Sequence, residues 1–170
     1  MKNFVIAILV VAVGALGFLL YNNNNSDDSS KSDSTTANDT SKSTSGKTID
    51  LANQGLSEVS KNILDDSKVT TLDVSNNNLT GALPAEIRKL TNLEVLDASD
   101  NKMTGIPAEI GQLSKLKTAD FSNNDISGLP LEIGNLTNLV TLDLRGNPNI
   151  SKYDISQIQP KIPNAQILVD

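Results

Sequence analysis

Five aspartates recur at nearly constant intervals, and they are the residues most able to do chemistry in this sequence. They stand 23 or 24 residues apart, at Asp50, Asp73, Asp97, Asp120 and Asp143. A line of carboxylates can attract a basic partner or divalent cations. Alternatively, these aspartates are part of the scaffold and bond to hydroxyl groups two residues away, among them those of Ser75, Ser99 and Ser122. The sequence leaves both interpretations open.

Two residue types that many enzymes use are missing. The chain of 170 residues has no histidine and no cysteine, which removes the commonest general base, the thiolate nucleophile and two frequent metal ligands. It contains no phosphate-binding glycine-rich loop, no nucleophile elbow and no set of ligands at metal-binding spacing. The acidic segment 122–125 lacks the twelve-residue loop of an EF-hand. We therefore expect no enzyme activity, no cofactor and no metal site.

Three glutamates also recur, each two residues after a proline: Glu86, Glu109 and Glu132. They could be proposed as catalytic carboxylates. Proline suits the first position of a helix, and an acid in the first turn interacts favourably with the positive end of the helix dipole. Because helix starts explain all three residues, we interpret them as structural.

The aspartates belong to a longer repeat that must position them. Segments starting at residues 46, 69, 93, 116 and 139 align without gaps as GKTIDLANQGL, VTTLDVSNNNL, LEVLDASDNKM, LKTADFSNNDI and LVTLDLRGNPN, and a truncated sixth copy, IPNAQI, starts at 162. A period in the twenties that is sustained over several copies predicts a solenoid. Apolar residues at spacings of three and then two predict a short strand that directs them into a core, with the aspartate facing outward.

An asparagine follows each aspartate of the second to fifth copies by four residues, at Asn77, Asn101, Asn124 and Asn147. At this position the chain must turn, and an asparagine amide can bond to nearby main-chain groups. Stacked copies can satisfy backbone groups that a buried turn would otherwise leave unpaired. We therefore expect this column to be structural.

The pattern LxxLxLxxNxL over residues 46–170 resembles that of the leucine-rich repeat family. The intervening segments LPAEIRKLTN, IPAEIGQLSK and LPLEIGNLTN are similar to its bacterial and plant-type repeats. The resemblance implies an α/β solenoid of about five repeats, shaped as a right-handed horseshoe arc. Its parallel β-sheet would form the concave face, and short helices or irregular turns the convex one. A helix starting at Ser151 and a strand within 162–169 would cap the C-terminal end.

A non-catalytic interaction module is the function that this resemblance implies, with the concave face as its binding surface. The candidate residues on that face are Asp50, Asp73, Asp97, Asp120, Asp143, Ser75, Ser99, Ser122 and Arg145. Phe121 falls on an inward position, so Arg145 is the one residue there of a type that dominates binding hot spots. We expect modest affinity.

The charge limits the kind of partner. With a net charge of −6 and an isoelectric point near 4.6, the chain lacks the basic surface that displaces counterions from nucleic acids. A protein or glycan ligand, and one with basic groups, fits better.

The N-terminal quarter of the chain differs from the repeats in composition. Phe4–Leu20 is a run of 17 residues without a polar side chain, long enough as a helix to cover roughly 25 Å, near the lower limit for a bilayer. It is either an uncleaved transmembrane anchor over residues 1–21 or a cleaved signal sequence, and its continuation past the small-residue cleavage sites favours the anchor. Lys2 precedes it and two aspartates follow it, which predicts that the C-terminal part lies outside the cytoplasm.

Residues 22–45 are rich in Ser, Asn, Asp and Thr and have no large apolar residue, a composition typical of a disordered linker. The sequence thus predicts a binding module displayed outside the membrane on a tether by a single-pass anchor. A structural spacer or adhesin domain without a defined ligand is the alternative. If the N-terminal segment is cleaved, the protein is secreted.

Overall fold

The structure, a computed structural model, describes residues 46–170. The expected anchor Phe4–Leu20 and the expected linker 22–45 lie outside the described residues. Within the described part, no helix is long and apolar enough to cross a membrane.

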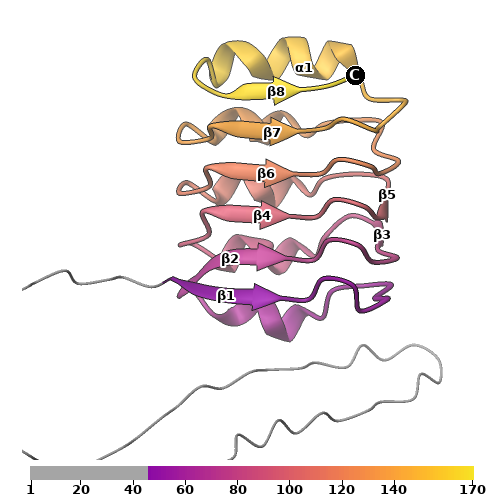
Figure 1. Cartoon of the computed structure of the whole chain (residues 1–170). Helices are drawn as coiled ribbons and strands as arrows, with labels where there is room; N and C mark the ends of the chain where they lie inside the picture. The colour runs from indigo at the N-terminus through magenta and orange to yellow at the C-terminus, as the bar shows by residue number, and fades with distance from the viewer. Residues whose placement is uncertain (1–45) are drawn as a thin grey trace, which may run out of the picture.

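A six-stranded parallel sheet forms one side of the molecule, and each strand lies beside the strand of the preceding repeat (Figure 1). The strand order is β1-β2-β4-β6-β7-β8. The strands are β1 (Lys47–Asp50), β2 (Val69–Asp73), β4 (Val95–Asp97), β6 (Thr118–Asp120), β7 (Thr141–Asp143) and β8 (Gln166–Leu168). This confirms the solenoid and its parallel sheet.

From Thr48 onward, the register of the sheet follows the sequence repeat for the first five strands; Lys47 pairs one position off, with Val69. Leu72 pairs with Leu96, Leu96 with Ala119, and Ala119 with Leu142. The sixth copy differs, because Leu142 pairs with Ile167 rather than with the residue 23 positions later. The expected start of this copy at residue 162 was therefore wrong by two positions. A longer helical segment, α1 (Lys152–Ile158) followed by η5 (Gln159–Lys161), replaces the usual return limb and takes up the extra residues.

Short 3₁₀ helices lie on the other side of the sheet (Figure 1), as expected for the return limb. They are η1 (Lys61–Asp65), η2 (Ala85–Lys89), η3 (Ala108–Gln112) and η4 (Leu131–Asn135). The prolines of the last three occupy the N-cap rather than the first helical position expected, and the carbonyl of each accepts the first helical hydrogen bond, as Pro84 does from the Ile87 N–H at 3.0 Å. Each glutamate lies in the first turn, as expected.

The core between the sheet and the 3₁₀ helices is a ladder of aliphatic side chains. Leu72 and Leu96 from the strands and Ile87 from η2 are fully buried, and Phe121 is buried among them on the inward side of its repeat. Each layer of this core contacts only the layers of the neighbouring repeats, so stability is coupled between adjacent units.

A second, two-stranded parallel sheet was not expected from the sequence. Its strands, β3 (Thr80–Gly81) and β5 (Lys102–Met103), lie at the edge of the molecule where the chain leaves the turn and heads for the 3₁₀ helices (Figure 1). Gly81, which belongs to the one 24-residue repeat, has φ +68°, a conformation that glycine adopts without strain.

The C-terminal end carries the expected cap. The side chain of Ser151 accepts a hydrogen bond from the Asp154 N–H at 3.1 Å and caps α1. The Asp154 carboxylate in turn accepts from the Leu129 N–H at 3.0 Å, which ties α1 to the preceding repeat.

Candidate functional site

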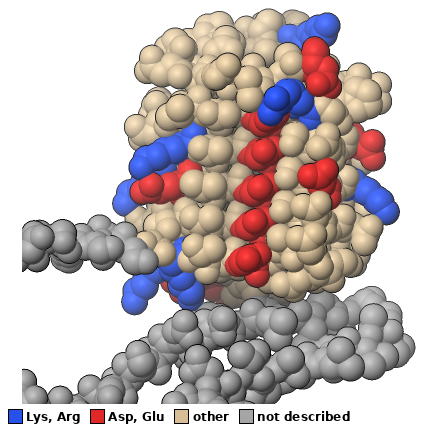
Figure 2. Space-filling model, viewed as in Figure 1, with Lys and Arg blue, Asp and Glu red and all other residues tan. Residues whose placement is uncertain are grey.

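The five aspartates form one continuous acidic line across the strands, in the middle of the sheet face (Figure 2). They pair in register from Asp50 to Asp73, Asp97, Asp120 and Asp143, so neighbouring carboxylates are separated by about one strand spacing, ~4.8 Å. Asp50 is exposed and the next three aspartates are half-buried. We call these five residues the aspartate column.

One oxygen of each carboxylate is used locally. It accepts a hydrogen bond from the backbone N–H two residues later, at 2.8–3.1 Å. The bond therefore goes to the main chain and not to the serine or threonine hydroxyls that the sequence suggested, except at Asp97, which also accepts from the Ser99 hydroxyl at 2.7 Å. This bond fixes the exit of each strand into its turn.

The other oxygen, Oδ2, is available on four of the five aspartates. No hydrogen bond to the Oδ2 of Asp50, Asp73, Asp97 or Asp120 exists among the described residues. The column therefore presents a line of carboxylate oxygens to solvent. Because the strands hold these oxygens in place, a basic ligand can meet them with little reorganisation.

Asp143 closes the column at one end. It is 5% exposed, and the Arg145 guanidinium bonds to both of its oxygens, with Nε at 3.0 and 3.1 Å and Nη2 on Oδ2. The hydrogen bonds from Arg145 lower the pKa of Asp143, against a smaller opposing effect of burial. Asp143 and Arg145 are thus paired with each other, and the open part of the column is Asp50 to Asp120.

Two of the expected face residues are not accessible. Ser75 and Ser99 are only 6% and 8% exposed. Ser122 is half-buried. The prediction that these serines line a binding surface was wrong for Ser75 and Ser99.

A second outward column borders the aspartates on the strands. It pairs Thr71 with Val95, Thr118 and Thr141 in register, and Val95 is 37% exposed at its centre. The described strand face thus combines acidic, hydroxyl and small apolar groups. Phe121 points into the core, as expected.

The asparagine column has the opposite character. Asn77, Asn124 and Asn147 are buried. The Nδ2 of each lies within 3.5 Å of three main-chain carbonyls, and the Oδ1 accepts from an N–H of the preceding repeat; Asn124, for example, bonds to the carbonyls of Ala98, Phe121 and Ser122 and to the Met103 N–H. Half-buried Asn101 has the same arrangement. These bonds join successive turns, as the sequence predicted.

The residue before each member of the asparagine column was overlooked in the sequence. It has a positive φ of 53–69°, at Asn76, Asp100, Asn123 and Gly146. In the first repeat the equivalent residue, Asn53, precedes Gln54 and has φ 59°. Asn, Asp and Gly are the residues that tolerate this left-handed conformation. Their recurrence at one repeat position was the signal that could have revealed it.

The helix-start glutamates show no catalytic arrangement. The pKa of Glu86 is lowered, chiefly by its own backbone N–H and then by Lys61, whose Nζ lies 3.3 Å away, so it stays ionised. Glu109 and Glu132 occupy the equivalent first turns of η3 and η4. Over residues 46–170, no group of three or more acidic side chains is placed to hold a metal ion.

More than half of the chain matches sequence models of one family. Residues 68–90 and 92–113 match a model described as Leucine Rich Repeat, and residues 114–158 match one described as Leucine Rich repeats (2 copies). No curated protein sequence matches the chain significantly.

Solved structures with the same architecture come from bacteria and plants. A leucine-rich repeat protein of Leptospira interrogans is 38% identical with a TM-score of 0.62, over 66% of this chain and 28% of that one. The plant peptide hormone receptor RGFR1, solved in complex with RGF2, is 32% identical with a TM-score of 0.54, over 66% and 18%. The ectodomain of the Arabidopsis thaliana receptor kinase SOBIR1 is 30% identical with a TM-score of 0.57, over 71% and 66%. The chain thus spans less than a third of the first two proteins.

Proposed function

Because the chain belongs to the leucine-rich repeat family, we propose that residues 46–170 form a non-catalytic protein-interaction module that binds a basic segment of a partner protein across the strand face. The face in question is the outward side of β1, β2, β4, β6 and β7. The 3₁₀ helices lie behind it and leave it uncovered (Figure 1).

The observation that carries this proposal is the line of free Oδ2 atoms on the aspartate column. In an extended peptide laid across the strands, side chains on one face are about 6.6 Å apart, against about 4.8 Å between the carboxylates. The long, flexible side chains of lysine and arginine can bridge this difference. Charge-assisted hydrogen bonds of this kind are stronger than neutral ones. Arg145, held on Asp143, bounds the site at its C-terminal end and favours a ligand whose positive charges stop there.

The relatives support a peptide or protein ligand. RGFR1 is described as a peptide hormone receptor and was solved with RGF2, and it shares this architecture at 32% identity. Since the strand face has no exposed aromatic side chain among the described residues, the free energy of binding must come chiefly from charge pairs and hydrogen bonds. Such binding is sensitive to salt.

The N-terminal segment completes the proposal. Phe4–Leu20 anchors the protein in the membrane and residues 22–45 tether the module outside it. If the segment is cleaved instead, the same module acts as a secreted protein.

Site-specific photo-crosslinking in the native membrane tests the binding face. A photo-reactive residue replaces Val95 on the strand face in one variant and Thr137, exposed beside η4, in the matched control. We expect a discrete crosslinked partner from position 95 and none from position 137. Equal crosslinking from both positions, or none from position 95, would contradict the proposal and leave a structural spacer as the better interpretation.

Charge removal tests the mechanism. Asp97→Asn combined with Asp120→Asn keeps the Oδ1 acceptors and removes two negative charges. We expect slower association of a bound basic partner and a weaker dependence of that rate on salt, because complementary charge acts mainly on the on-rate. An unchanged rate at both low and high salt would show that the column is scaffold.

A further inference from the structure

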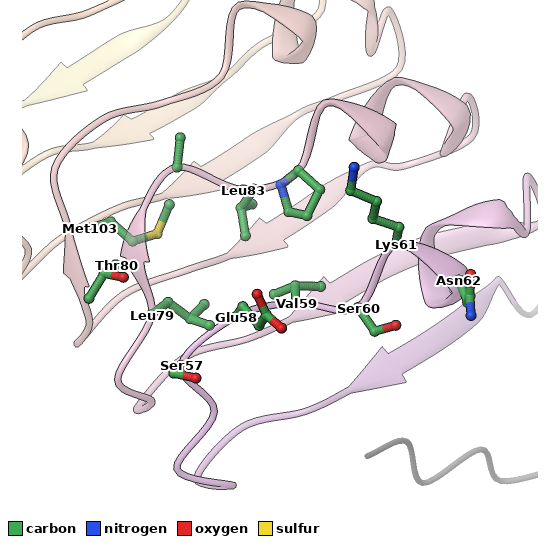
Figure 3. A pocket seen from close by; sticks show the side chains of 12 residues that line it. Ser57, Glu58, Val59, Ser60, Lys61, Asn62, Leu79, Thr80, Leu83 and Met103 are labelled. Carbon is green, nitrogen blue, oxygen red and sulfur yellow. The ribbon is translucent and has the colours of Figure 1, made fainter. Parts of the chain in front are cut away.

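A groove lies away from the strand face, between the first repeat and β3 (Figure 3). Its volume is about 570 Å³. Its apolar lining comes from Val59, Leu79, Leu83 and Met103, which are otherwise buried, and its polar rim includes Glu58. Half of the twelve lining residues are polar, Lys61 among them, and half are apolar. A mixed surface of this kind suits a peptide segment that offers both apolar and polar groups.

One wall of the groove is the open edge of β3. On its paired side, the Leu79 carbonyl accepts from the Lys102 N–H at 2.9 Å, and the Gly81 carbonyl from the Thr104 N–H at 2.9 Å. Because successive residues of a strand direct their backbone groups to opposite edges, the N–H and C=O of Thr80 point away from β5. Outside the β3–β5 ladder, no described hydrogen bond uses the backbone of Thr80 or of Ala82, and both residues are exposed.

The edge is open because the first repeat forms no strand that could pair with β3. The Leu56 carbonyl accepts from the Asn78 N–H at 2.8 Å, as the Leu79 carbonyl does from Lys102 in the next repeat. After Leu56 the chain forms no strand before η1. Residues 57–60 run past β3 without pairing with it, and the groove lies between them and β3 (Figure 3).

We propose that this groove binds an extended segment of a partner protein, which pairs with β3 as a third strand of the small sheet. The segment carries an aliphatic residue that enters the apolar lining between Val59 and Leu83. It carries a lysine or arginine near Glu58, a carboxylate on the rim that has no ion pair among the described residues.

The free backbone edge distinguishes this occupant from a small molecule. Main-chain hydrogen bonds supply affinity in strand addition, and pockets for alternate side chains supply specificity. The groove offers both elements side by side (Figure 3). The inference is independent of the strand face, because none of the groove residues belongs to the aspartate column.

Linear heptapeptides displayed on phage, selected against the full chain in detergent micelles, provide the probe. We expect the enriched peptides to combine an aliphatic residue with a lysine or arginine. In a capped synthetic copy, methylating the backbone nitrogens that face β3 should weaken binding at least tenfold, whereas methylating those of the opposite edge should change it less than twofold. This comparison requires no change in the protein.

Two protein variants locate the site. Ala82→Trp fills the groove from an exposed position and should weaken binding at least tenfold. Asp97→Asn with Asp120→Asn, on the strand face, should leave it within twofold. Residue-resolved hydrogen exchange should show a rapidly exchanging Thr80 amide that slows at least tenfold when the peptide is bound.

The proposal is overturned if no peptide is enriched, if the two methylated copies bind alike, or if Ala82→Trp binds as the wild type does. Peptides that lose affinity only in the aspartate double variant would place binding on the strand face. That result would support the proposed function and reject this inference. Loss only in Ala82→Trp would support this inference and would not bear on the strand face.

Discussion

The asparagine column and the aspartate column repeat with the same period and stand four residues apart, yet the structure uses them in opposite ways. Each asparagine turns inward and satisfies main-chain groups of two repeats, as Asn124 does for Met103 of the preceding repeat and Phe121 of its own. Each aspartate uses one oxygen for the backbone N–H two residues later, and four of the five keep the second oxygen toward solvent.

The asparagine column stabilises the fold, whereas the aspartate column leaves carboxylate oxygens on the surface that are available for binding. A buried amide that bonds to several main-chain groups cannot be changed without leaving polar groups unpaired. A carboxylate with one local bond and one free oxygen can be changed to its amide with little structural effect. Regular recurrence in the sequence therefore does not by itself separate scaffold from site.

The largest expected effect is at Asn124. Asn124→Ala leaves the buried Met103 N–H without its partner and removes the bonds to the carbonyls of Ala98 and Phe121. Since each buried group left unpaired costs about 1–3 kcal/mol, we expect a loss of about 2–4 kcal/mol in the free energy of unfolding, measured in urea. The control is Asn78→Ala, at an exposed asparagine without a described side-chain bond, where about 0.5 kcal/mol or less is expected. Equal losses would contradict the structural role of the column.

The left-handed position between the two columns comes next. Gly146 has φ +69°, and a Cβ there would lie 2.3 Å from Asn123 Oδ1. Gly146→Ala should therefore destabilise by about 1–3 kcal/mol through strain and this clash. Gly55→Ala, at φ +68° with nothing within 4 Å of the added Cβ, should cost less. A thermal-unfolding comparison in which Gly55→Ala is the more damaging change would contradict the close packing between these turns.

Asp97 tests the scaffold share of the aspartate column. Asp97→Ala removes the acceptor for the Ser99 N–H and hydroxyl and should cost about 0.5–1.5 kcal/mol. Asp97→Asn keeps an acceptor and relieves repulsion between neighbouring carboxylates, so its stability should lie within about 0.5 kcal/mol of the wild type or slightly above it. If the amide costs as much as the alanine in urea unfolding, charge rather than hydrogen bonding holds the turn.

The smallest expected effect is on the pH dependence of stability, through the pair of Asp143 and Arg145. Arg145 lowers the pKa of this carboxyl below its ordinary value of 3.8 in the folded state. The interaction therefore contributes stability above that ordinary value, and the contribution is lost as the pH falls through the lower folded-state pKa. Asp143→Asn should be less stable than the wild type at pH 7, and the gap should narrow in acid unfolding. Arg145→Gln should show the same trend, and a gap that stays constant with pH would contradict it.

The sequence alone was sufficient for the repeating part of the fold. The spacing of the apolar residues placed Leu72 and Leu96 in the core. The recurrence of asparagine after each strand placed the asparagine column in the turns. The sequence also indicated Ser151 as the start of the cap helix. These features depend on which side of a strand or turn a residue faces, and this is set by local periodicity within each repeat. Phe121 was assigned to the interior for the same reason.

Hydrogen-bond partners and packing between neighbouring segments were decided only by the tertiary structure. The sequence showed that the aspartates recur, but not that Asp97 bonds to a backbone N–H, that Ser75 is buried, or that Arg145 folds onto Asp143. The groove beside β3 and the two-residue shift of β8 arise where the first and last repeats depart from the period. At these ends the chain has a neighbouring repeat on one side only, so the contacts available there, and not the repeat, determine its path.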